Sequence, residues 1–115
     1  MLDSRILKRF LEKKKRLDAH RPLPAPILKN LKDYFTVEWT YHSNAIEGNS
    51  LSLRETQLVL REGLTIKGKS LREHFEAKNH EKAIEFLETI IRPRYRLNEK
   101  DILNLHGLVL SGIEE

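Results

Sequence analysis

The chain has 115 residues, which is enough for one compact domain. Of these residues 39% are hydrophobic and 33% charged, a composition typical of a soluble globular protein rather than a disordered one. It contains no cysteine, which excludes a disulfide scaffold, cysteine-ligated zinc and thiol nucleophiles. No apolar run approaches the ~20 residues that span a bilayer, and the first residues lack a signal peptide's apolar core. We therefore expect a cytoplasmic protein with no membrane partner.

The net charge of +4 is concentrated near the start, in Lys8–Arg9 and Lys13–Arg16. Such basic clusters can attract nucleic acid. Runs of this length are more often the solvated face of a helix, and neither a recognition-helix pattern nor interleaved aromatic residues accompany them. The sequence therefore disfavours nucleic acid, but a small basic helical module that binds it stays as an alternative hypothesis.

Apolar residues at three- and four-residue steps predict a first helix from about residue 2 to His20. The proline-rich segment Arg21–Pro26 ends it, because proline lacks an amide donor and restricts the residue before it. A second helix is predicted from about Ile27 to Ile46, with Gly48 as its C-terminal stop. Three aromatic residues are interpreted as packing residues of this helix: Phe35, Trp39 and Tyr41.

Three later helices are predicted from N-cap signals. Ser52 with Glu55 and Ser70 with Glu73 match the capping box, and Asn98 begins a looser version. The predicted helices are Leu53–Glu62, Leu71–Ile91 and Glu99–Leu110. Their expected core residues are Leu53, Leu58, Val59 and Leu60; Leu71, Phe75, Ala83, Ile84, Leu87 and Ile91; and Ile102, Leu105 and Val109. The segment Thr65–Gly68 is too short to assign to a strand or hairpin.

These elements predict an all-α helical bundle. The chain stops just after the last predicted helix, with no further element to cover the apolar residues of that helix. Because a domain normally buries such a face, we expect the bundle to be truncated.

Ser43 and Glu47 lie four residues apart near the end of the second predicted helix, and Gly48 follows. On a helix this spacing places both side chains on one face. The helix dipole disfavours a carboxylate at a C-terminus, so Glu47 should need a cation, and arginine meets a carboxylate with two parallel hydrogen bonds. From spacing alone we favour the simpler interpretation, a polar helix end with a glycine turn, because short motifs match by chance.

Residues 41–53 read Tyr-His-Ser-Asn-Ala-Ile-Glu-Gly-Asn-Ser-Leu-Ser-Leu. They resemble the inhibitory motif of the Fic family, Ser/Thr-x-x-x-Glu-Gly/Asn, which Ser43, Glu47 and Gly48 meet. The segments 53–56, 76–84 and 97–106 are similar to the first helices of the Fic core, so the resemblance covers about residues 35 to 115. It implies the front part of a Fic-type fold, in which residues 1–50 form an N-terminal helical region ending in the inhibitory helix. Residues 51–115 would form the first helices of an incomplete core.

The resemblance also implies a function for the complete protein, the transfer of AMP from ATP, with magnesium, to a hydroxyl side chain of a target protein. The family's base is a histidine in the loop His-x-Phe-x-x-Gly-Asn-Gly-Arg/Lys-x-x-Arg. In inhibited members the inhibitory glutamate pairs with the last arginine of this loop and keeps it from the γ-phosphate. Glu47 would be that glutamate, and Ser43 the accompanying hydroxyl.

The catalytic loop does not occur among the 115 residues. We therefore assign no catalytic residue, metal ligand or cofactor to this chain, and ATP and magnesium are implied for the complete protein alone. No glycine-rich loop follows any of the five histidines, His20, His42, His74, His80 and His106. His106 is interpreted as a packed or partly exposed helix residue rather than a base, and His74 and His80, six residues apart, lack the spacing of a zinc pair.

Two arrangements of the inhibitory helix remain open. The chain would be either the autoinhibitory portion of a longer enzyme, acting on a catalytic Fic core in cis, or a free-standing antitoxin-like inhibitor acting in trans. The target protein and the formation of a homo-oligomer also stay open.

Overall fold

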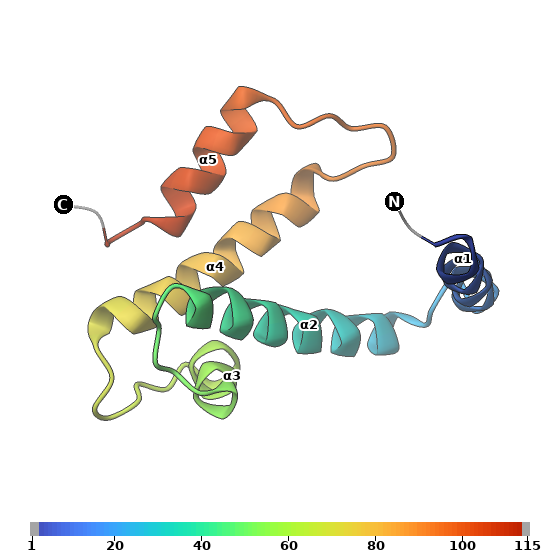
Figure 1. Ribbon diagram of the computed structural model, residues 1–115. Coiled ribbons are helices and arrows are strands. Elements are labelled where there is room, and N and C mark those ends of the chain that lie inside the picture. Colours follow the sequence, from blue (N-terminus) through green and yellow to red (C-terminus); the bar gives the residue numbers. More distant parts are fainter. Residues whose placement is uncertain (1–2, 114–115) are drawn as a thin grey trace. The chain divides into compact units, whose positions relative to one another are not determined.

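The computed structural model describes residues 3–113. Figure 1 shows the helices and the loops that join them. The helices are α1 (Ser4–Asp18), α2 (Ala25–Ile46), α3 (Leu53–Glu62), α4 (Leu71–Ile90) and α5 (Glu99–Val109). Residues 3–113 contain no strand, so the predicted all-α fold class is confirmed, and Thr65–Gly68 forms an irregular turn. Among these helices none is long and apolar enough to cross a membrane.

The chain divides into two compact units, residues 1–32 and residues 33–115. The division falls inside α2, so the first turns of this helix belong to the first unit and the rest to the second. The boundary that the sequence suggests at residue 50 stays a prediction.

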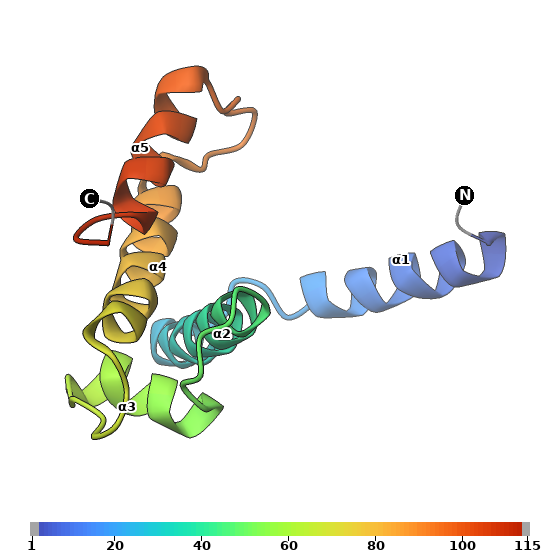
Figure 2. The same ribbon diagram turned by 60° about the vertical axis from the view of Figure 1, so that its left-hand side comes forward.

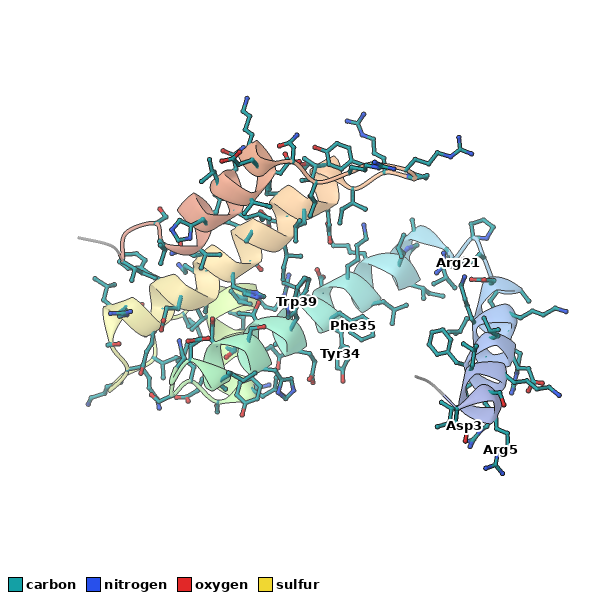
Figure 3. The ribbon with its side chains drawn as sticks, turned by 45° about the horizontal axis from the view of Figure 1, so that its top comes forward. Asp3, Arg5, Arg21, Tyr34, Phe35 and Trp39 are labelled. Atoms are coloured by element: carbon teal, nitrogen blue, oxygen red, sulfur yellow. The ribbon has the colours of Figure 1, made fainter. Side chains whose placement is uncertain are left out.

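α1 begins at an aspartate cap, where the Asp3 side chain accepts a hydrogen bond from the Arg5 amide at 2.7 Å. The start of this helix is labelled in Figure 3. Lys15 and Arg16 lie in its last turn, where cations complement the helix dipole. No residue of α1 is buried.

Three capping boxes start α3, α4 and α5, at the three N-cap residues that the sequence predicts. At α3 the Ser52 hydroxyl accepts from the Glu55 amide at 3.0 Å, and the Glu55 carboxylate accepts from the Ser52 amide at 2.9 Å. Gly63 ends α3 with φ +65°, a left-handed conformation that favours glycine.

The core of the second unit lies between α3 and α4. Leu51, Val59 and Ala77 are 3%, 1% and 0% exposed and form one cluster, with Leu60 and Ile66 packed against it. α5 runs antiparallel beside α4, as both ribbon views show (Figure 1 and Figure 2). A buried amide joins these two helices, because the Asn79 side chain donates to the Val109 and Ser111 carbonyls at 3.1 and 2.7 Å.

The predicted core faces are partly wrong. Val59, Ala83 and Ile84 are buried as expected. Leu53 and Leu71 are the first residues of their helices and Ile91 is the C-cap of α4, so they lie at helix ends beyond the packed stretch. Leu53, Leu71 and Ile91 are 40%, 69% and 63% exposed. Ile102 and Val109, at 58% and 42%, lie on the face of the last helix for which the sequence predicts no covering element.

Candidate functional site

The predicted motif lies at the C-terminal end of α2 and in the turn that follows. Ser43 is half-buried in the last turn of the helix, whereas Glu47 and Gly48 are exposed just beyond it. The Glu47 amide donates to the Asn44 carbonyl and the Gly48 amide to the Ala45 carbonyl, both at 3.1 Å. Gly48 has φ +93°, which explains why a glycine stands here. The predicted glycine stop is confirmed.

The Glu47 carboxylate makes no hydrogen bond or ion pair with any of residues 3–113, and the same holds for the Ser43 hydroxyl. Its neighbour Ile46 is 83% exposed, so the end of the helix presents an acidic and an apolar side chain to solvent. The nearby helix C-terminus carries partial negative charge and does not compensate a carboxylate. This arrangement can accept a cationic group from outside the described residues.

Polar side chains fix the turn that follows the motif. Asn49 is 9% exposed, and its amide donates to the Glu73 carbonyl and to Glu76 Oε1, each at 3.1 Å. The Ser50 hydroxyl donates to Glu73 Oε1 at 2.9 Å, which holds the pKa of the Glu73 carboxyl below its usual range. Lys69 Nζ donates to the Ser50 carbonyl at 2.8 Å. The exposed Glu47 is therefore followed at once by an anchored segment.

The middle of α2 is held by a threonine and a histidine. Thr40 is fully buried, and its hydroxyl shares a 2.8 Å hydrogen bond with Nδ1 of His80 on α4. Burial lowers the pKa of the His80 imidazole and so favours its neutral form. The Trp39 ring meets the His80 ring edge-on, with centroids 5.4 Å apart.

The interpretation of the α2 aromatic residues as packed is wrong for Phe35, which is 59% exposed, and only partly right for Trp39, which is 51% exposed. Figure 3 labels both side chains on α2, together with Tyr34. The buried positions of this stretch are instead the smaller Val37 and Thr40.

An arginine on α3 contributes a further attachment to α2. Arg61 Nη1 lies 3.1 Å from Asp33 Oδ1, and Arg61 Nη2 lies 3.5 Å from Oε2 of Glu81 on α4. Burial raises the pKa of the Glu81 carboxyl despite this neighbour. The Arg61 guanidinium acts in the opposite direction, but it is closer to Asp33 and compensates the desolvation of Glu81 only partly.

Sequence reasoning missed Asn49, Thr40, His80 and Arg61 as residues that hold the motif in place. One signal was available: a small polar residue directly after a turn glycine often bonds the backbone nearby, as Asn49 does when its Oδ1 accepts from the Leu51 amide at 2.9 Å. The other three act through partners that are distant in the chain, which spacing does not reveal.

His74 is also fixed by hydrogen bonds. Its Nε2 accepts from the Ile66 amide at 2.9 Å, so its Nδ1 carries the proton and donates to the Ser70 carbonyl at 2.7 Å. The ring ties the loop before α4 to the start of that helix, which is a structural role. Within residues 3–113 no group of three histidine, aspartate or glutamate side chains is placed to hold a metal ion.

Comparison with known proteins gives a consistent picture. No family model matches the chain. The protein adenylyltransferase Fic of Drosophila grimshawi is 33% identical over 114 residues, which are 98% of this chain and 23% of that protein. The protein of the same name from Nematostella vectensis is 32% identical over 112 residues, 96% of this chain and 26% of that protein. The chain therefore spans about a quarter of the length of these relatives.

A solved structure gives the same result for the fold. Fic-1 of C. elegans, residues 134–508, matches with a TM-score of 0.79 and 29% sequence identity. The match covers 96% of this chain and 33% of that one. Both units of the chain thus take part in the similarity.

Proposed function

The chain belongs to the Fic family, with its all-α fold, and from this premise we propose that α2 is the inhibitory helix of a Fic-type protein adenylyltransferase. The complete protein would transfer AMP from ATP, with magnesium, to a hydroxyl side chain of a target protein. The curated relatives carry the name protein adenylyltransferase, which supports the reaction class. The helices α3 to α5 would form the first part of the core that carries the catalytic loop.

The observation that carries this proposal is the exposure of Glu47 and its lack of an ionic partner among the described residues. Its carboxylate is exposed and without an ionic partner in residues 3–113, although the helix and turn on either side of it are anchored. A carboxylate held this way can meet an arginine of the catalytic core in a bidentate pair. That arginine would then be withheld from the γ-phosphate of ATP, so the nucleotide would bind in an unproductive pose.

Ser43 has a secondary role in the proposal. It stands one helical turn before Glu47, and residues four apart lie on the same side of a helix. Ser43 is half-buried, and its hydroxyl has no hydrogen-bond partner among the described residues. It would support the same arginine contact, so its loss should matter less than the loss of the Glu47 charge.

The test is Glu47→Gly in the complete protein, with auto-AMPylation as the measurement. Hydrogen bonds to charged groups contribute about 1.5–3 kcal/mol, so losing the pair should raise the rate by about tenfold or more. Glu62→Gly is a matched control, because Glu62 is also exposed at a helix end and also precedes a glycine with positive φ. Unchanged activity in Glu47→Gly, or an equal rise in both variants, would overturn the assignment.

The exposed carboxylate equally fits an antitoxin-like inhibitor that acts in trans on a separate catalytic chain. Titrating the 115-residue chain into a catalytic Fic core separates the two arrangements. Inhibition that saturates at one chain per core, and that Glu47→Gly removes, supports action in trans. A core that already contains its own inhibitory helix and does not respond to the added chain supports action in cis.

A further inference from the structure

We propose that Asn49 is the positioning residue for Glu47, because it locks the turn after α2 onto the side of α4. This inference rests on the proposed role of Glu47 and adds what holds that glutamate in place. Asn49 does not itself meet the arginine or the nucleotide in this proposal. It acts through the backbone of the turn.

The first argument is the number and burial of the Asn49 contacts. The side-chain amide donates twice, to the Glu73 carbonyl and to Glu76 Oε1, and its Oδ1 accepts from the Leu51 amide. Asparagine is the residue whose short amide offers donors and an acceptor at this reach. With 9% exposure the group is almost shielded from water, so its removal would leave the buried Leu51 amide without its partner.

The second argument is that the neighbouring contacts are weaker substitutes. Ser50, Glu73 and Lys69 form hydrogen bonds around the same turn, but these bonds are exposed to solvent. Water competes with exposed hydrogen bonds, so each contributes little net stability. Asn49 is therefore the polar contact on which the path of the turn depends most.

The third argument is the short distance along the chain between the anchor and the motif. Only Gly48 separates Glu47 from Asn49. The backbone amide of Asn49 closes the end of α2 by donating to the Asn44 carbonyl at 3.0 Å. Glu47 thus lies between the end of a helix and a fixed side chain. If the anchor is lost, the turn opens, and a carboxylate that moves by an ångström no longer meets a guanidinium in parallel geometry.

Hydrogen exchange on the 115-residue chain tests the anchor directly. In Asn49→Ala the backbone amides of Glu47, Gly48 and residue 49 should exchange about 5- to 30-fold faster, the factor expected when buried hydrogen bonds are lost. Asn79→Ala is the matched control, because Asn79 is also a buried asparagine whose amide donates twice to partners on another segment. It should leave these three amides unchanged and speed exchange near Leu110 and Ser111. Equal exchange in the parent chain and Asn49→Ala overturns the proposal.

Auto-AMPylation of the complete protein links the anchor to inhibition. Asn49→Ala should raise the rate several-fold, whereas Asn79→Ala should not, and Asn49→Ala should add nothing to Glu47→Gly because the glutamate is already absent. A purely structural role would change the rate equally in both backgrounds. If Asn49→Ala does not fold, Glu76→Ala removes one of the two acceptors and should give a smaller rise in the same direction.

The outcomes separate the two proposals. No rise in Glu47→Gly overturns the inhibitory role itself. A rise in Glu47→Gly without one in Asn49→Ala or Glu76→Ala leaves that role standing and overturns the positioning role of Asn49.

Discussion

The helix α1 and the turn from Asn49 to Leu51 differ in burial, and the difference is the opposite of what their sequence patterns predict. α1 has the regular apolar spacing of a helix that packs on a core, yet it contains no buried residue. The turn is a short irregular segment, yet Asn49 and Leu51 are 9% and 3% exposed. Periodicity therefore predicts that a helix forms, whereas burial depends on which partners the rest of the chain supplies.

The turn also shows how one segment can be both anchored and accessible. Leu51 enters the core beside Val59 and Ala77, and Asn49 bonds the first half of α4. Glu47, two residues before Asn49, is exposed. A fixed backbone carrying an exposed charge loses little conformational entropy when it binds, which is the requirement for a preorganised inhibitory contact.

The largest effect on stability that tests this contrast is expected at Leu51. Leu51→Ala removes a side chain that is 3% exposed, and such core truncations cost about 2–5 kcal/mol. Urea unfolding followed by circular dichroism measures the loss. Leu53→Ala is the control, because Leu53 is 40% exposed at the start of α3 and should cost about 1 kcal/mol or less. Equal losses at the two positions would show that the turn is no better packed than the helix surface.

The local structure of the chain could largely be predicted from its sequence. The bounds of α3 are those predicted, and α4 and α5 each end one residue before the predicted residue. These predictions succeed because a capping box, a turn glycine or a proline acts through residues next to one another in the chain. The motif position is local too, so Ser43, Glu47 and Gly48 lie at the end of α2 as expected.

The contacts between elements could not be predicted in the same way. The Thr40–His80 hydrogen bond joins residues 40 positions apart, and Asn79 bonds carbonyls about 30 positions later. No periodicity links such partners, because their meeting depends on how whole helices pack. The prediction that the aromatic residues of α2 pack was wrong for Phe35 and only partly right for Trp39 for the same reason, since the buried positions of this stretch are Val37 and Thr40.

Lowering the pH should reduce the free energy of unfolding through His80, which bonds α2, by a smaller amount than Leu51→Ala does. Because burial lowers the pKa of His80 below its usual value of about 6.5, the unfolded chain takes up this proton more readily. The stabilisation is thus complete above pH ~6.5 and is lost as the pH falls toward the folded-state pKa. Unfolding free energies measured between pH 7.5 and 5, roughly the range where histidine titrates, should decline.

His80→Asn isolates this effect because asparagine does not titrate. The lowered pKa of Glu73 acts at more acidic pH, and the raised pKa of Glu81 gives the opposite sign, since its protonation favours the folded state as the pH falls. The decline between pH 7.5 and 5, about the histidine range, should therefore flatten in His80→Asn. An identical pH profile in the two proteins would show that His80 does not couple to folding.

The smallest effect is expected on α1, and it tests the other side of the contrast. Phe10 is 64% exposed on a helix without buried residues, so Phe10→Ala should change the unfolding free energy by about 0.5 kcal/mol or less. A buried phenylalanine would instead cost about 3–5 kcal/mol. The measurement is urea unfolding under the conditions used for Leu51→Ala, so the two variants give a direct ratio. A large loss of unfolding free energy in Phe10→Ala would mean that the apolar face of α1 is covered in solution. Both α1 and the turn would then be buried, and they would differ only in what covers them.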